Sequence, residues 1–232
     1  MTEFLKAISE RVLILDGAMG TLLQERGLSP GGCPEEMNRN APDVVIGIHA
    51  AYAEAGADVL IANSFGGNRV KLANYNLGNA VDELNRRAVA LARKAAPAGV
   101  FVGGSVGPTG RFVEPVGDAG FDEMIDIFAE QVSSLVGAGA DLISFQSFLD
   151  IRELRAGVIA CRDVCNLPVI AQMTVDDGGR TVLGTPTSAA AVTLDALRVD
   201  VIGANCGLGI DGIHDVLAEM RQVKPRPLIA LA

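Results

Sequence analysis

The stretch Val199-Asp-Val-Ile-Gly-Ala-Asn-Cys-Gly207 reads as a short buried strand that ends in two polar residues and a glycine turn. The polar residues are Asn205 and Cys206, and they follow a run of apolar and small side chains. Two earlier stretches have the same form, AGADVLIANSF at 55–65 and AGADLISFQSF at 138–148. The chain therefore repeats one unit, a strand that begins after AGAD or its equivalent and ends in a polar residue.

Aligning the three stretches on their aspartates, Asp58, Asp141 and Asp200, places three amide side chains in one column. These are Asn63, Gln146 and Asn205. Parallel strands that each carry a polar residue at the carboxyl end bring those residues to a common edge. The repeat predicts that the three amides lie on one rim of a parallel sheet.

Composition limits the classes of function. The 232 residues are 49% hydrophobic and 20% charged, which is typical of one globular domain with a large core. The formal charge of −9 and the absence of a basic cluster argue against a nucleic acid or an anionic membrane as partner. No apolar run is long enough to span a membrane, and the N-terminus does not resemble a signal peptide. Four cysteines without a disulfide-framework spacing predict a reduced, cytoplasmic protein.

Hydrophobic periodicity predicts strands and helices that alternate along the chain. The predicted strands are 12–15, 57–62, 100–104, 141–145, 168–174, 199–204 and 227–232. The predicted helices are 42–55, 81–96, 121–137, 150–165, 187–197 and 211–222, with a further helix start after the 16–20 loop. The Gly/Pro/Asn-rich residues 27–41 predict a loop.

Strict alternation implies a parallel sheet with right-handed crossovers, either doubly wound or closed into a barrel. No G-x-G-x-x-G follows the first strand, so the dinucleotide signal of the open fold is absent. Polar residues end many of the strands, and a barrel collects ligand groups from all strand ends. We therefore expect a single domain over 1–232 with a (β/α)8 TIM-type barrel that lacks its last strand and helices, since the count stops at strand seven.

Six motifs in order resemble the homocysteine S-methyltransferase family, and most of all the homocysteine-binding module of cobalamin-dependent methionine synthases. They are DGAMGT at 16–21, PEEMN at 34–38, NSFGGNRVKL at 63–72, the GPTG that closes 104–110, DLISFQSFLDIREL at 141–154 and GANC at 203–206. The likeness runs from about residue 11 to the end of the sequence. It implies transfer of a methyl group to the thiol of homocysteine, with a methyl-corrinoid (methylcobalamin) or a methyltetrahydrofolate-linked system as donor.

The resemblance also implies a zinc ion held by three cysteines, which activates the substrate thiol as a thiolate. Cys206 would be one metal ligand and a catalytic residue, and Asn205 beside it would orient or contact the metal. The implied substrate-binding residues are Asp16, Gly17, Ala18, Gly20, Thr21, Asn63 and Gln146. The implied partners are a small thiol substrate and a corrinoid- or folate-binding domain or protein.

Two departures from the family pattern stand out. The adjacent cysteine pair that supplies the other zinc ligands is absent from the 232 residues, so those ligands are expected beyond residue 232. Gln146 stands where the family usually has Glu, which keeps a hydrogen-bond acceptor and loses the charge.

Structural roles compete with these functional ones. Cys206 could be a small packed hydrophobe, Asp16 a helix cap, and Asn63 or Gln146 a partner for loop backbone. Cys161 and Cys165, one helical turn apart, are expected in core packing, and His49 and His214 in surface or core roles. Two other functions stay open, a metal-free barrel that binds a ligand or partner, and an unrelated phosphate-binding barrel enzyme.

Overall fold

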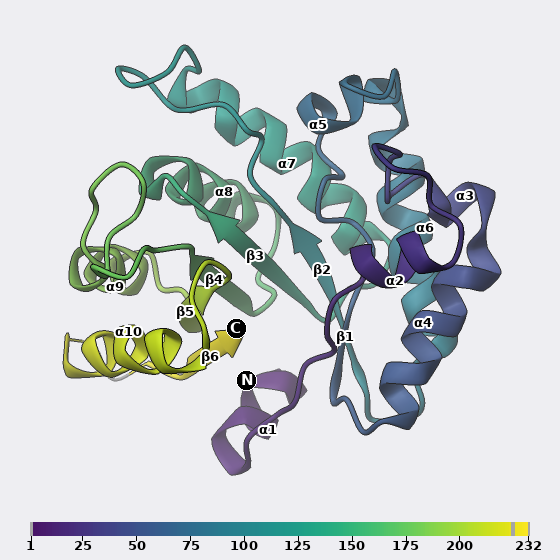
Figure 1. Cartoon of the computed structure of the whole chain (residues 1–232), viewed down its shortest axis with the longest axis horizontal. Coiled ribbons are helices and arrows are strands. Elements are labelled where there is room, and N and C mark those ends of the chain that lie inside the picture. The colour runs from purple at the N-terminus through teal and green to yellow at the C-terminus, as the bar shows by residue number, and fades with distance from the viewer. Residues whose placement is uncertain (1, 224–225, 232) are drawn as a thin grey trace.

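The computed structural model describes residues 2–223 and 226–231 and shows one parallel sheet of six strands, each paired with the next along the chain (Figure 1). The strands are β1 (Val59–Ile61), β2 (Phe101–Val106), β3 (Leu142–Phe148), β4 (Val169–Met173), β5 (Val201–Asn205) and β6 (Leu228–Leu231). Sequential parallel order is the topology of a TIM-type barrel. The sheet is a curled part of such a barrel, which confirms the predicted fold class.

Helices follow the strands and lie outside the curved sheet (Figure 1). The longer ones are α4 (Pro42–Glu54), α6 (Val81–Ala95), α7 (Phe121–Gly137), α8 (Ile151–Val164), α9 (Thr187–Ala196) and α10 (Ile210–Val223). The short ones are α1 (Glu3–Glu10), α2 (Gly20–Glu25), α3 (Met37–Asn40), α5 (Arg69–Ala73) and the 3-10 turn η1 (Gly78–Ala80). Among the helices described, none combines the length and the apolarity that crossing a membrane requires.

The sequence prediction needs three corrections. The segment 12–15 is not a strand, because only Leu15 pairs with β1, through a single parallel bridge to Val59. Strand β3 continues past Gln146 to Phe148, since the pairing with β4 resumes after an irregularity. The helices α1, α3 and α5 were not predicted, because helices of eight residues or fewer leave little periodicity to detect.

The curled sheet is open on one side. Within residues 2–223 and 226–231, no pairing joins β6 to the segment that holds Leu15, so the two edges of the sheet stay apart. Between them lies an apolar groove of about 540 Å³. Helix α1 lies at this side of the molecule (Figure 1), and its Phe4 and Ile8 line the groove together with Leu228 and Ile229.

The inside of the sheet is layered. The lowest layer is apolar and consists of Val59, Phe101, Leu142, Ile170, Val201 and Ile229, whose side chains form one cluster. Two pairs of it, Val59 with Phe101 and Ile170 with Val201, lie opposite each other in the strand register. Phe4 of α1 closes it from below and meets Phe101 edge-on, with 5.5 Å between ring centroids. This packing explains why α1 forms, because its apolar face has a core to cover.

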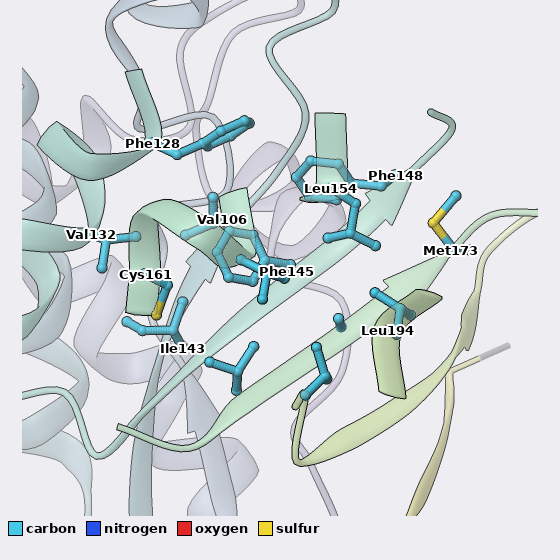
Figure 2. Packing of buried hydrophobic residues seen from close by; sticks show 14 of the residues in the cluster. Val106, Phe128, Val132, Ile143, Phe145, Phe148, Leu154, Cys161, Met173 and Leu194 are labelled. Carbon is cyan, nitrogen blue, oxygen red and sulfur yellow. The ribbon is translucent and has the colours of Figure 1, made fainter. Parts of the chain in front are cut away.

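The main core lies between the sheet and the outer helices. Phe128 of α7 packs with Phe145 and Phe148 of β3, with ring centroids 5.8 to 6.3 Å apart (Figure 2). All three rings are fully buried, so each removes a large apolar area from water. Gly157 of α8 allows the helix to approach this cluster, because a Cβ there would lie 2.7 Å from the Phe145 ring.

The repeated aspartates of the AGAD units have one structural role. Each accepts a backbone N–H at the start of a neighbouring strand or segment, Asp58 from Ile14, Asp141 from Val102 and Asp200 from Val169, at 2.7 to 2.9 Å. Each also pairs with an arginine, namely Arg11, Arg93 and Arg162 in the same order. The aspartates therefore fix the lower ends of the strands, which leaves the upper ends to carry the site.

Candidate functional site

The upper ends of the strands enclose a cavity of about 410 Å³, called here the rim cavity. Its walls are Leu15, Asp16, Gly17, Ala18, Met19, Gly20, Pro34, Glu35, Ile61, Ala62, Asn63, Ser64, Phe65, Ser105, Gln146, Ser147, Asn205, Cys206 and Leu231. Eight of the nine candidate residues from the sequence analysis are in this set. Thr21 is the exception, because it lies exposed in the first turn of α2. The structure thus brings the candidates together at the carboxyl ends of the strands, where TIM-type barrels carry their active sites.

Cys206 is exposed at one side of the rim cavity and lies beside Asn205 and Ser147. The Asn205 amide Nδ2 is 3.3 Å from the Cys206 sulfur and donates to the Ser147 hydroxyl at 2.7 Å. Asn205 Oδ1 accepts the Ser147 backbone N–H at 2.8 Å. Asn205 therefore uses both ends of its amide to hold the carboxyl end of β3 against the carboxyl end of β5, with the thiol next to it.

The backbone at this point is unusual. Ser147 and Cys206 both have φ of +60°, a left-handed conformation that few non-glycine residues adopt. Ser147 falls within the irregularity of β3 between Phe145 and Phe148, and such bulges re-aim side chains at the rims of barrels. No signal in the sequence marked Ser147, because a serine in a strand pattern carries no sign of a bulge.

Asp16 lies buried in the cavity wall, at the end of the segment that bridges to β1. Its Oδ2 accepts the Ile61 N–H at 2.9 Å, and the ring Nδ1 of the fully buried His49 of α4 is 3.8 Å from the same oxygen. Burial raises the pKa of Asp16, while His49 and the Ile61 N–H act in the opposite direction. Sequence reasoning placed His49 in a surface or core role and missed this contact.

Helix α4 also supports the loop that follows Asp16. The Tyr52 hydroxyl, one turn after His49, donates to the Ala18 carbonyl at 2.9 Å. Gly17 lies against the same ring, since a Cβ there would be 2.9 Å from the hydroxyl oxygen. The glycine is thus needed for close approach, and Tyr52 sets the height of the loop on the cavity wall.

Asn63 and Gln146 have different surroundings. Asn63 Nδ2 donates to the Pro34 carbonyl at 2.7 Å and to Asn38 Oδ1 at 3.0 Å, so its amide nitrogen holds the 34–38 loop. Gln146 Oε1 accepts the hydroxyl of Ser105 at 3.1 Å. Glu35 of this loop lines the cavity, and its carboxylate accepts the Gly66 N–H at 2.6 Å. The motif at 34–38 was noticed in the sequence, but no role was assigned to Glu35.

The other cysteines lie away from Cys206. Cys33 is buried, and its thiol contacts Glu35 Oε2 at 3.3 Å, while burial raises its pKa to about 12. Cys161 and Cys165 lie at the end of α8. Within the described part of the chain, no three His, Cys, Asp or Glu residues are placed to hold a metal ion together. Since zinc sites take three or four protein ligands, these residues alone do not fit a zinc ion, and Cys206 supplies one ligand only.

Comparison with known proteins identifies the family. The sequence profile described as homocysteine S-methyltransferase matches residues 13–232. Methionine synthase of Mycobacterium tuberculosis is 34% identical over 227 residues, which cover 90% of this chain and 19% of that protein. Methionine synthase of Mycobacterium leprae is 33% identical over the same length and coverage. The chain therefore spans about a fifth of the length of these relatives.

Solved structures agree on the fold. The metallated form of the homocysteine methyltransferase MmuM from Escherichia coli superposes with a TM-score of 0.85 at 22% identity, covering 97% of this chain and 85% of that one. Its apo form gives a TM-score of 0.79 at 24% identity, covering 97% and 84%. With a profile match over nearly the whole sequence and a cavity built from the motif residues, the chain belongs to the homocysteine S-methyltransferase family.

Proposed function

We propose that this chain binds homocysteine in the rim cavity and presents its thiol for methylation, which yields methionine. The observation that carries the proposal is the pairing of Asp16 and Cys206 on the walls of one cavity. A carboxylate at one side suits the ammonium group of an amino acid, and a cysteine at the other marks the position of the sulfur chemistry. A volume of about 410 Å³ accommodates a small amino acid.

The amino-acid end of the substrate would lie against the 16–20 loop. Asp16 would accept the ammonium group, and Gln146 would add a neutral acceptor. The backbone of Gly17 to Gly20 would meet the carboxylate, because loop residues ahead of a short helix expose N–H groups. Thr21 belongs to this proposal only through its backbone, since its side chain lies outside the cavity wall.

The sulfur end would lie near Cys206, with Asn205 and Ser147 beside it. Methyl transfer forms a bond from the substrate sulfur to the methyl carbon and breaks the bond from that carbon to the donor, so the thiol proton must leave. The thiolate is the reactive form, and a free thiol near pKa 8.5 is mostly protonated at neutral pH. A zinc ion with three protein ligands would remove that proton, and Cys206 is the one ligand that the described residues supply at the cavity.

The methyl donor we propose is a methyl-corrinoid or a methyltetrahydrofolate-linked system, carried by a further domain or a separate protein. The two mycobacterial relatives support this, because the chain matches about a fifth of each of them. The assay is methionine formation from homocysteine and methylcobalamin, with a Cys206→Ala variant as control. A competent protein that loses turnover with Cys206→Ala supports the proposal, and unchanged turnover in the variant contradicts it.

The alternative proposal is a metal-free barrel that binds a small ligand or a partner protein. It would use the polar walls of the rim cavity, such as Asp16 and Gln146, without a metal ligand. Calorimetry with homocysteine in the presence of a chelator separates the two. A homocysteine affinity that changes with neither chelator nor added zinc, in a protein without turnover, favours the binding module. The family membership of the chain removes the third possibility, an unrelated phosphate-binding barrel enzyme.

A further inference from the structure

Two cysteines outside the rim cavity lie in contact at the end of α8. The sulfur atoms of Cys161 and Cys165 are 3.8 Å apart. Cys161 is fully buried in the main core, where it lies near Ile143 (Figure 2), and Cys165 is partly exposed. The pair precedes β4, so it lies at the lower end of the sheet, opposite the rim cavity. Neither sulfur takes part in the proposed methyl transfer.

The backbone explains why the sulfurs meet. Cys165 is the C-cap of α8, with an extended conformation (φ −154°, ψ 171°), and its N–H donates to the Cys161 carbonyl at 2.9 Å. The chain thus leaves the helix at Cys165, whose side chain is not fixed by helical geometry. A disulfide requires the sulfurs to approach to about 2.05 Å, and a residue outside the helix can turn to meet a fixed partner.

Arg162 holds the segment after α8 in place. Its guanidinium donates to the Leu167 carbonyl at 2.8 Å, to the Arg198 carbonyl at 2.8 Å and to Asp200 at 2.9 Å. These bonds tie the connection between α8 and β4 to the next repeat of the fold. Cys165 therefore stays close to Cys161 instead of moving away with a loose loop.

The surroundings shift the pKa values of the two thiols in opposite directions. Contact with the Cys161 thiol lowers the pKa of Cys165, and the Leu167 N–H and the Arg162 guanidinium act in the same direction. The same contact, together with burial, raises the pKa of Cys161. Cys165 is the sulfur that solvent reaches, and Cys161 is its buried partner at 3.8 Å. This is the arrangement of a reactive cysteine with a resolving partner.

We propose that Cys161 and Cys165 form a peroxide-reactive pair that closes reversibly to an intramolecular disulfide. The Cys165 thiolate attacks one oxygen of hydrogen peroxide and the O–O bond breaks. Hydroxide departs, and Cys165 becomes a sulfenic acid. The Cys161 sulfur then attacks the Cys165 sulfur, the S–O bond breaks, and the Cys161 proton leaves with the departing hydroxide as water. Overall, two thiols and one peroxide give one disulfide and two waters, and an added dithiol reverses the step.

The sequence offers a direct readout, because Arg162 lies between the two cysteines. The intact protein is treated with hydrogen peroxide, free thiols are blocked by alkylation, and the protein is cleaved by trypsin without reduction. The reduced pair gives two alkylated peptides, 156–162 and 163–180. The disulfide gives one linked species that separates into the two peptides on reduction. Its mass is lower by two hydrogens than the summed masses of the two unalkylated peptides.

Three variants sharpen the test. Cys165→Ser should abolish the linked peptides, and Cys161→Ser should leave a sulfenic acid at Cys165 that a dimedone probe traps. Cys206→Ser, which removes the exposed thiol of the rim cavity, is the matched control and should leave the linkage unchanged. Cys165→Ser changes a partly exposed side chain, so it keeps the test valid even where Cys161→Ser fails to fold. The proposal would be overturned if peroxide oxidised Cys206 while peptides 156–162 and 163–180 stayed separate. It would also be overturned if Cys165 were oxidised to the sulfinic acid while Cys161 stayed a free thiol.

Discussion

His49 Nδ1 lies 3.8 Å from Asp16 Oδ2, and no described residue offers a hydrogen bond to either ring nitrogen of this fully buried histidine. Asp16 must carry a charge to bind an ammonium group, yet burial raises its pKa and so favours the neutral acid. The nearby His49 ring opposes that effect, because it lowers the pKa of Asp16. We therefore propose that His49 is a positioning residue, which acts on the substrate through Asp16.

Two replacements of His49, one with and one without a hydrogen-bond donor near Asp16, test this relationship. In His49→Asn the amide nitrogen takes about the place of Nδ1 and keeps a donor toward Asp16, whereas His49→Leu has none. We expect His49→Leu to raise the Kd or KM for homocysteine about fivefold, because it removes a polar contact with Asp16 worth about 1 kcal/mol. The kcat should change much less, and His49→Asn should recover most of the affinity. Equal losses in both variants, or a loss in kcat alone, would mean that His49 only packs the core.

Gln146→Glu should tighten the binding of homocysteine. Gln146 lines the rim cavity, and its Oε1 accepts the Ser105 hydroxyl, a bond that a carboxylate can keep. Charge-assisted hydrogen bonds exceed neutral ones by about 1 kcal/mol, so we expect a roughly fivefold lower Kd by calorimetry. The matched ligand is 4-mercaptobutanoate, which lacks the ammonium group. If it gains affinity as homocysteine does, Gln146 does not face the ammonium.

Zinc content should depend on more than the 232 residues. Cys206 is the one cysteine that lines the rim cavity, and a zinc site takes at least three protein ligands. We expect a polypeptide of residues 1–232 to retain far less than one zinc per chain after dialysis. A form extended to include an adjacent cysteine pair should hold about one zinc per chain, and Cys206→Ser should remove most of it. Tight stoichiometric zinc in the 1–232 form would show that the ligands lie elsewhere.

The sequence allowed the fold to be predicted from its repeat. Strand and helix alternate strongly, and each AGAD unit marks the lower end of a strand by an aspartate that accepts a backbone N–H. Local patterns of this kind survive in the fold because the sheet buries each strand in the same manner. The segment 12–15 shows the limit, since an apolar run forms a strand only where successive residues pair with a neighbouring strand, and here only Leu15 is paired.

The sequence predicts which strand-end residues form the site, but not which residues support them. Residues at strand ends, such as Asp16 and Asn205, follow from topology, because parallel strands deliver them to one edge. Ser147 and His49 do not, since the first depends on a bulge in β3 and the second on how α4 docks behind the loop. Both are tertiary relationships between distant segments, which no single stretch of sequence records.

Glu153→Gln should change how stability depends on pH. Glu153 is buried in the first turn of α8, and its Oε1 accepts the backbone N–H of Thr109 at 2.7 Å and its hydroxyl at 2.6 Å. Burial raises the pKa of Glu153 from 4.5 to about 7. Between these two values the folded protein keeps a proton that the unfolded chain has lost, so the free energy of unfolding falls as pH rises.

The glutamine variant keeps the acceptor for Thr109 and cannot titrate. Relative to wild type, we expect Glu153→Gln to gain stability as pH rises from 4.5 to 8, by up to about 3 kcal/mol. Urea unfolding of both proteins across this range measures the difference directly. Glu54→Gln makes the same chemical change at an exposed carboxylate and should show no such trend. A Glu153→Gln difference that stays constant with pH would mean that Glu153 is ionised throughout, with the Thr109 bonds strong enough to outweigh its burial.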